Sequence, residues 1–199
     1  MLCLLLTASL VRAGQESILV LGDSISAAYG MSVQQGWVAL LAGRLTDSHP
    51  DLTIVNASIS GETTAGGLRR LPQLLSAHSP SIVLVELGAN DGLRGYPITT
   101  FRSNLEQIVA LSQAAGAQVV LLPMEIPPNY GRRYTSAFHD SYARIAQSTD
   151  STLAPFILAG VAGNPTLTQA DGLHPTVSAQ PRLLDNVLPT LIKLLGQAP

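Results

Sequence analysis

The sequence predicts a three-layer α/β fold in which helices cover both faces of a parallel β-sheet. Apolar runs of strand length alternate along the chain with segments in which apolar residues recur at helical spacing. The runs are nearly continuous in Val, Ile and Leu, which is typical of parallel strands buried on both faces. The 199 residues show no internal repeat or linker, so we expect one domain with a full core.

The expected elements alternate in order. Strands are expected at residues 18–22, 53–57, 81–87, 117–122 and, with the weakest pattern, 153–157. The helices between them are marked by Trp37, Leu40, Leu41 and Leu45; by Leu68, Leu71, Leu74 and Leu75; by Phe101, Leu105, Ile108 and Val109; by Phe138, Tyr142 and Ile145; and by Leu183, Leu184, Val187, Leu188 and Leu191. We expect Pro72 to kink or restart the second helix and Pro189 to interrupt the last one. Gly116 is expected to cap the third.

The chain begins with an apolar stretch, residues 1–13, that ends in a small residue. This resembles the apolar region and cleavage site of a secretory signal, although the basic start of such a signal is missing. We therefore expect 1–13 to be a signal peptide and 14–199 to form a single domain. The alternative, a buried N-terminal segment, is disfavoured by the polar residues 15–17. The stretch contains the one cysteine, Cys3, and is too short to span a bilayer, so we expect no stable membrane insertion.

Charge and motifs exclude several functions. The net charge is −2 and 12% of residues are charged, with no basic stripe, so no nucleic-acid partner is expected. The sequence has no metal-ligand cluster and no glycine-rich loop for phosphates or dinucleotides, so we expect no metal and no cofactor. It also has no Gly-x-Ser-x-Gly, which argues against an α/β-hydrolase elbow. The expected partner is a small-molecule substrate, bound by a monomer.

A serine follows the first apolar run directly, in Gly22-Asp23-Ser24. Ligands of open parallel sheets bind outside the carboxyl ends of the strands, which is where Ser24 lies. Ser24 is either the N-cap of a following helix or a nucleophile whose alkoxide a helix N-terminus would stabilise. A free hydroxyl is a weak nucleophile and needs a general base, so the choice depends on finding one.

A carboxylate and an imidazole lie three residues apart in Asp171-Gly172-Leu173-His174, a spacing that allows a hydrogen bond on one turn. His49, His78 and His139 have no carboxylate at a useful spacing. His174 has a structural interpretation as a loop histidine, but its loop precedes the last helix and can reach Ser24. We therefore expect Ser24 as nucleophile, His174 as base and Asp171 as the carboxylate that orients it.

Two further segments follow expected strands, Ser60-Gly61 and Gly88-Ala89-Asn90-Asp91. Gly61 and Asn90 have structural interpretations as turn residues. The functional interpretation needs the same properties: tight loops that turn a backbone N–H and a carboxamide toward one point, as an oxyanion hole requires.

These segments resemble the four sequence blocks of the GDSL/SGNH hydrolases. The blocks here are Gly22-Asp23-Ser24, Asn56-Ala57-Ser58-Ile59-Ser60-Gly61, Gly88-Ala89-Asn90-Asp91 and Asp171-Gly172-Leu173-His174-Pro175. The resemblance covers nearly all of 14–199 and implies a flavodoxin-like, five-stranded parallel sheet of order 2-1-3-4-5. It implies an oxyanion hole of Ser24, Gly61 and Asn90 beside the catalytic Ser24, Asp171 and His174.

The resemblance is nearest to periplasmic bacterial members of the family, and it implies a periplasmic or secreted serine esterase for fatty acyl esters, thioesters and lysophospholipids. The alternatives are a carbohydrate acetylesterase on the same fold and a non-catalytic, flavodoxin-like small-ligand-binding module. The segment 124–130 follows the fourth expected strand, and we expect Ile126, Asn129 and Tyr130 to bind substrate. Its structural interpretation is a surface loop that covers the core.

Overall fold

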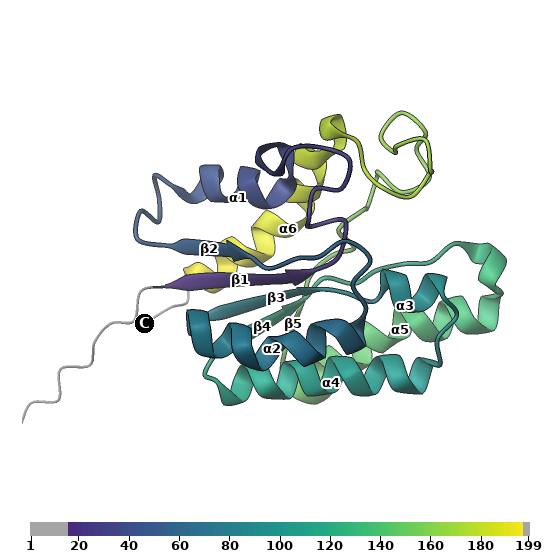
Figure 1. Ribbon diagram of the computed structural model, residues 1–199, viewed down its shortest axis with the longest axis horizontal. Coiled ribbons are helices and arrows are strands. Elements are labelled where there is room, and N and C mark those ends of the chain that lie inside the picture. Colours follow the sequence, from purple (N-terminus) through teal and green to yellow (C-terminus); the bar gives the residue numbers. More distant parts are fainter. Residues whose placement is uncertain (1–15, 197–199) are drawn as a thin grey trace, which may run out of the picture.

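A parallel sheet with helices on both faces forms the domain, described here for residues 16–196 of a computed structural model (Figure 1). The strands are β1 (Ser17–Gly22), β2 (Thr53–Asn56), β3 (Ile82–Glu86), β4 (Gln118–Leu121) and β5 (Thr152–Leu153). Their order in the sheet is β2-β1-β3-β4-β5, and every neighbouring pair is parallel. The expected fold class and strand order are confirmed. The expected signal peptide 1–13, with Cys3, lies outside the described residues.

The helices divide between the two faces of the sheet. Figure 1 shows α1 (Trp37–Leu45) and α6 (Gln180–Leu195) on one face and the remaining helices on the other. These are α2 (Thr64–His78), the short α3 (Ala89–Leu93), α4 (Ile98–Ala114) and α5 (Arg132–Thr149). In the described part of the chain, no helix combines the length and the apolar character needed to cross a membrane.

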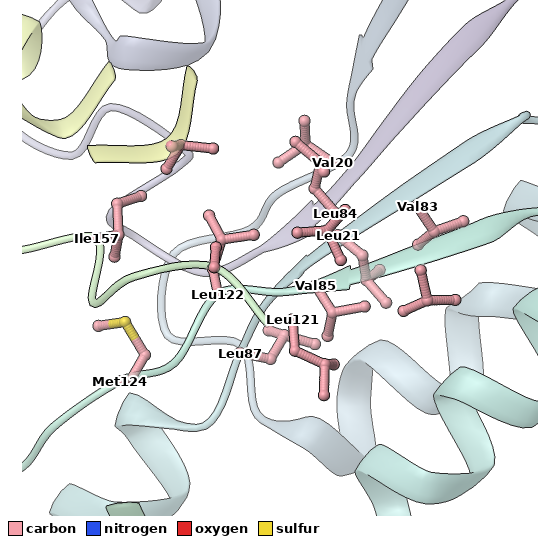
Figure 2. Close-up of a cluster of buried hydrophobic side chains, with 14 of the residues drawn as sticks. Val20, Leu21, Val83, Leu84, Val85, Leu87, Leu121, Leu122, Met124 and Ile157 are labelled. Atoms are coloured by element: carbon pink, nitrogen blue, oxygen red, sulfur yellow. The ribbon is translucent and has the colours of Figure 1, made fainter. Parts of the chain in front are cut away.

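Apolar side chains of the central strands form the core. Ile18 to Leu21 of β1 and Val83 to Val85 of β3 are fully buried. Figure 2 shows that the cluster continues past the strand ends through Leu87, Leu122 and Ile157. The burial of these strands on both faces explains why their sequences do not alternate with polar residues. The edge strand β2 is half-exposed instead.

Two sequence expectations differ from the structure. The helices continue across both prolines: α2 does not restart at Pro72, and Pro189 does not interrupt α6. Leu71 and Leu75 are buried on either side of Pro72, so core packing outweighs the hydrogen bond that proline cannot donate. The fifth strand has two residues instead of five, since Pro155, two residues past its end, has no N–H for further pairing.

The register of the sheet sets up one polar edge. Gly22 at the end of β1 pairs with Glu86 at the end of β3. The loops that leave these strands therefore begin side by side, at the edge where the carboxyl ends of the parallel strands meet. The long connection between β5 and α6 approaches the same edge (Figure 1).

Candidate active site

Ser24 lies on a sharp turn directly after β1. Its carbonyl accepts from the Tyr29 N–H at 3.1 Å, and the Asp23 carbonyl accepts from Ala27 N–H at 2.9 Å. Gly22 is required here, because a Cβ would lie 2.7 Å from both Ser26 Cβ and Ser58 Oγ. Turns follow Ser24, and the N-cap of α1 is Gly36, so Ser24 is neither the cap of that helix nor at its N-terminus. The expected contribution of a helix N-terminus to a serine alkoxide is therefore absent for α1.

Ser24, His174 and Asp171 form a continuous chain of hydrogen bonds. His174 Nε2 lies 2.8 Å from Ser24 Oγ, and His174 Nδ1 lies 2.6 Å from Asp171 Oδ2. An ionised carboxylate only accepts hydrogen bonds, so Nδ1 of a neutral His174 carries the proton and Nε2 is the acceptor for the serine hydroxyl. Tyr29 packs against the His174 ring, with centroids 4.3 Å apart. The structure thus brings Ser24 into contact with His174, which lies 150 positions away in the sequence.

Asp171 is exposed, yet its surroundings favour the charged form. Its Oδ1 accepts the backbone N–H groups of Leu173 at 2.9 Å and His174 at 3.0 Å. These bonds, with the weaker effect of the His174 ring, lower the pKa of Asp171 to about 2. The loop is held by Gln169, whose amide donates to the Tyr29 carbonyl at 2.8 Å and the Pro175 carbonyl at 3.0 Å.

Asn90 and Gly61 lie at the same edge of the sheet. The Asn90 Nδ2 donates to Asp23 Oδ2 at 3.1 Å and to the Glu62 carbonyl at 3.0 Å. Asn90 lies in the one-turn helix α3, where the sequence suggested a turn. Gly61 has φ +79°, and its carbonyl accepts from Arg94 Nη2 at 3.1 Å. Among residues 16–196, the backbone N–H groups of Ser24 and Gly61 donate to no protein acceptor.

A buried acid pair lies beneath the Ser24 turn. Asp23 and Glu86 are both fully buried. Glu86 Oε2 accepts from the Asp23 N–H at 3.2 Å, the Ser26 N–H at 3.2 Å and the Ser26 hydroxyl at 2.7 Å. Burial raises the pKa of Asp23 to about 6. Burial and the neighbouring Asp23 hold the pKa of Glu86 well above its ordinary value.

Asp23 is a hydrogen-bonding residue of the turn, since its Oδ1 accepts the Ile25 N–H at 3.0 Å. Sequence reasoning missed Glu86 and Tyr29. A signal for Glu86 was present, because it is the one charged residue in the otherwise apolar run 82–87. No comparable signal marks Tyr29, whose contact with His174 comes from the fold.

The expected substrate-binding residues lie in the segment after β4. Ile126 is 8% exposed. It packs closely on Gly92 of α3, because a Cβ added to that glycine would lie only 2.5 Å from Ile126 Cγ2. Tyr130 donates from its hydroxyl to the Leu93 carbonyl at 2.7 Å, and Asn129 is exposed. Tyr130 also lines a hollow of about 620 Å³ with Ile98 and Tyr134 among others. The segment therefore packs on the helix that carries Asn90.

The chain is similar to several known proteins. A model of the GDSL-like lipase/acylhydrolase family matches residues 20–180. The esterase TesA of Pseudomonas aeruginosa is 51% identical over 193 residues, which are 97% of this chain and 96% of that protein. The thioesterase 1/protease 1/lysophospholipase L1 of Escherichia coli is 44% identical over 173 residues, 87% of this chain and 82% of that protein.

A solved structure agrees in fold as well. The crystal structure of the psychrotrophic esterase EstA from Pseudoalteromonas sp., inhibited by monoethylphosphonate, matches with a TM-score of 0.87 at 45% identity. The match covers 92% of this chain and all of that one. With the family model spanning most of the domain, the chain belongs to the GDSL-like lipase/acylhydrolase family.

Proposed function

We propose that this protein is a serine esterase that hydrolyses carboxylic esters and thioesters through an acyl-enzyme at Ser24. The observation that carries the proposal is the hydrogen-bonded chain from Ser24 Oγ through His174 to Asp171, at 2.8 and 2.6 Å. Family membership and the esterase and thioesterase relatives support the same chemistry.

The first half of the reaction forms the acyl-enzyme. His174 Nε2 takes the Ser24 proton as Oγ attacks the acyl carbon, and Asp171 stabilises the imidazolium that results. His174 then gives this proton to the departing alcohol or thiol. In the second half, water attacks the acyl carbon while His174 takes its proton, and the bond from the acyl carbon to Ser24 Oγ breaks. His174 returns that proton to Ser24 Oγ and the carboxylic acid is released.

The oxyanion needs donors that are ready before the reaction. The unpaired backbone N–H groups of Ser24 and Gly61 support their role as two of these donors. The third donor is the Nδ2 group of Asn90. One of its N–H bonds goes to Asp23 and holds the amide in place. The other, which points at the Glu62 carbonyl, would be shared with the oxyanion. These contacts strengthen as charge develops on the oxygen.

The substrates that we propose are fatty acyl esters, acyl thioesters and lysophospholipids, in line with the names of the relatives. The rival functions are deacetylation of carbohydrates and ligand binding without catalysis. Turnover of acyl esters of increasing length, compared with acetylated sugars, separates the first rival. Absence of any turnover by the wild-type protein would favour the second.

The proposal is tested by replacing the nucleophile. In Ser24→Ala, kcat on an aryl ester and on an acyl thioester should fall by about three or more orders of magnitude with the fold retained. Ser58→Ala is the matched control, since the buried Ser58 hydroxyl lies near the same turn and makes no hydrogen bond. Near-wild-type turnover by folded Ser24→Ala would contradict the assignment.

We further propose that Ile126, Asn129 and Tyr130 shape the acyl site, because their segment packs against the helix of Asn90. In Ile126→Ala, the ratio of kcat/KM for long against short acyl chains should change by about 10- to 200-fold, the effect of about one methylene in a hydrophobic pocket. Ile145→Ala in α5 is the control for loss of a buried side chain, since Ile145 is 1% exposed. If kcat/KM of wild type and Ile126→Ala differed by the same factor at every chain length, the segment 124–130 would have only a structural role.

Export to the periplasm or the medium is also proposed, on the pattern of residues 1–13. Fractionation of cells that express the full chain, with mass analysis of its N-terminus, tests both export and cleavage. A monomer is proposed because all the residues named for the reaction come from one chain. Size-exclusion chromatography with light scattering measures this.

A further inference from the structure

Glu86 is a buried acid that the reaction above does not use. It is the last residue of β3, paired in register with Gly22, so its carboxyl group lies under the turn that carries Ser24. Its exposed fraction is 0%. A carboxylate in this position would need compensation for its lost hydration, and within residues 16–196 Glu86 takes part in no ion pair.

The hydrogen bonds leave one oxygen of Glu86 free to carry a proton. Trp37 Nε1 can only donate, and it donates to Ser26 Oγ at 3.2 Å. The Ser26 hydroxyl proton is therefore directed at Glu86 Oε2, 2.7 Å away. With the N–H groups of Asp23 and Ser26 as well, Oε2 accepts three hydrogen bonds. Oε1 is buried and makes no hydrogen bond of standard geometry, so the oxygen that is free to carry a proton is Oε1.

Asp23 has the opposite pattern. Its Oδ1 accepts the Ile25 N–H and its Oδ2 accepts the Asn90 amide, so both oxygens act as acceptors. This pattern fits an ionised carboxylate. The titratable groups around the pair are Tyr142, which interacts with both acids, and His174, which favours the charged form of Asp23. The two acids interact with each other by hydrogen bonding and by charge. One proton between them suffices, and it belongs on Glu86.

We propose that Glu86 is a positioning residue for this active site: a neutral carboxylic acid that anchors the Ser24 turn through Asp23 and Ser26 and leaves Asp23 ionised to hold the Asn90 amide. The proposal rests on the proposed function, in which Asn90 binds the oxyanion. Glu86 acts through its neighbours and does not touch the substrate. Two carboxylates so close together would not both stay ionised in a buried site.

Substitution by glutamine tests the charge state. Glutamine keeps an acceptor oxygen for the three donors and offers an N–H in place of the acid O–H. Glu86→Leu removes both, and kcat should fall by about tenfold or more with a smaller change in KM. Glu86→Gln should restore kcat to within about threefold of wild type. A Glu86→Gln protein as impaired as Glu86→Leu would overturn the proposal.

A matched buried acid provides the control. Asp91 accepts from the Thr64 N–H at 2.9 Å and the Thr64 hydroxyl at 2.6 Å, and that hydroxyl itself accepts from Asn104. Both Asp91 oxygens face donors, so Asp91→Asn would set an NH₂ group against a donor. Thermal unfolding should show a clear loss of Tm for Asp91→Asn and little for Glu86→Gln. Equal losses in the two variants would contradict the assignment of the proton.

Infrared spectroscopy detects the proton without an activity measurement. At neutral pH the wild type should show the C=O stretching band of a protonated carboxylic acid, and Glu86→Gln should lack it. Absence of the band from the wild type would overturn the proposal even if Ser24 is the nucleophile. Presence of the band in a protein without esterase activity would instead retain the buried acid and reject the function.

Discussion

Asp171 and Asp23 both support groups at Ser24, but their environments are opposite. Asp171 lies on a loop with its side chain 38% exposed, and two backbone N–H groups hold its charge. Asp23 is fully buried, and its backbone N–H donates to the neighbouring buried acid Glu86. Their pKa values accordingly move apart, to about 2 for Asp171 and about 6 for Asp23.

The comparison shows that one residue type performs two tasks through its surroundings. In the proposed reaction, Asp171 orients a base that must gain and lose a proton, and backbone donors of its own loop favour the charged form of Asp171. Asp23 orients an amide in a rigid, buried network with Glu86 and Ser26. The first arrangement requires a tight loop, and the second requires the whole sheet register.

The two acids also affect stability with opposite sign. The lowered pKa of Asp171 contributes stability that is present above its ordinary value of 3.8 and is lost as pH falls through about 2. The raised pKa of Asp23 contributes stability that is present below 3.8 and is lost as pH rises through about 6.

The largest expected effect is on the Asp171 side. In Asp171→Asn, the new amide can either donate to or accept from His174 Nδ1. The proton is then no longer fixed on Nδ1, and Nε2 is no longer held as the acceptor for Ser24. We expect kcat to fall by about 10³- to 10⁴-fold, as loss of the correct tautomer does in such triads. Asp140→Asn, an exposed acid on α5, is the control. A loss below about tenfold would show that Asp171 does not orient the base.

A smaller effect is expected on the Asp23 side. Asn90→Ala removes the amide that Asp23 holds, and kcat should fall by about 10²- to 10³-fold with KM changed less. Asn104→Ala serves as control, because it also removes a side-chain amide, one that donates to the Thr64 hydroxyl. Steady-state kinetics on one aryl ester compares the two. An effect on KM alone would assign Asn90 to substrate positioning.

The smallest effect concerns the pH dependence of stability. Because the pKa of Glu86 is raised, the folded protein keeps a proton that the unfolded chain releases above about pH 4.5. The stability that Glu86 contributes should therefore fall with rising pH, by at most about 1.4 kcal/mol per pH unit. Urea unfolding of wild type and Glu86→Gln between about pH 5 and 7 measures this. Parallel curves would mean that Glu86 is already ionised.

Much of the fold follows from local sequence. The continuous apolar runs predicted β1, β3 and β4, because strands covered on both faces need apolar residues at every position. The alternative that the second helix restarts at Pro72 was wrong, since the effect of Pro72 on α2 depends on core contacts at Leu71 and Leu75 that sequence does not reveal. The length of β5 could not be predicted from its sequence either, because it is set by pairing with β4.

The candidate site was predictable where the chemistry is local. Asp171 and His174 lie three residues apart, so one turn accounts for their contact. Glu86 was not identified, because its partners Asp23 and Ser26 are 60 or more positions away and meet it through the β1–β3 register. The same holds for Tyr29 against His174.

The central claim, that Ser24 is the nucleophile, is tested most directly by covalent labelling. A fluorophosphonate reacts when an activated serine oxygen attacks phosphorus and fluoride leaves. Peptide mass spectrometry of the wild type should show one phosphonyl adduct, on the peptide that contains Ser24, and Ser24→Ala should show none. Labelling at another residue, or an active enzyme that stays unlabelled at Ser24, would contradict the account.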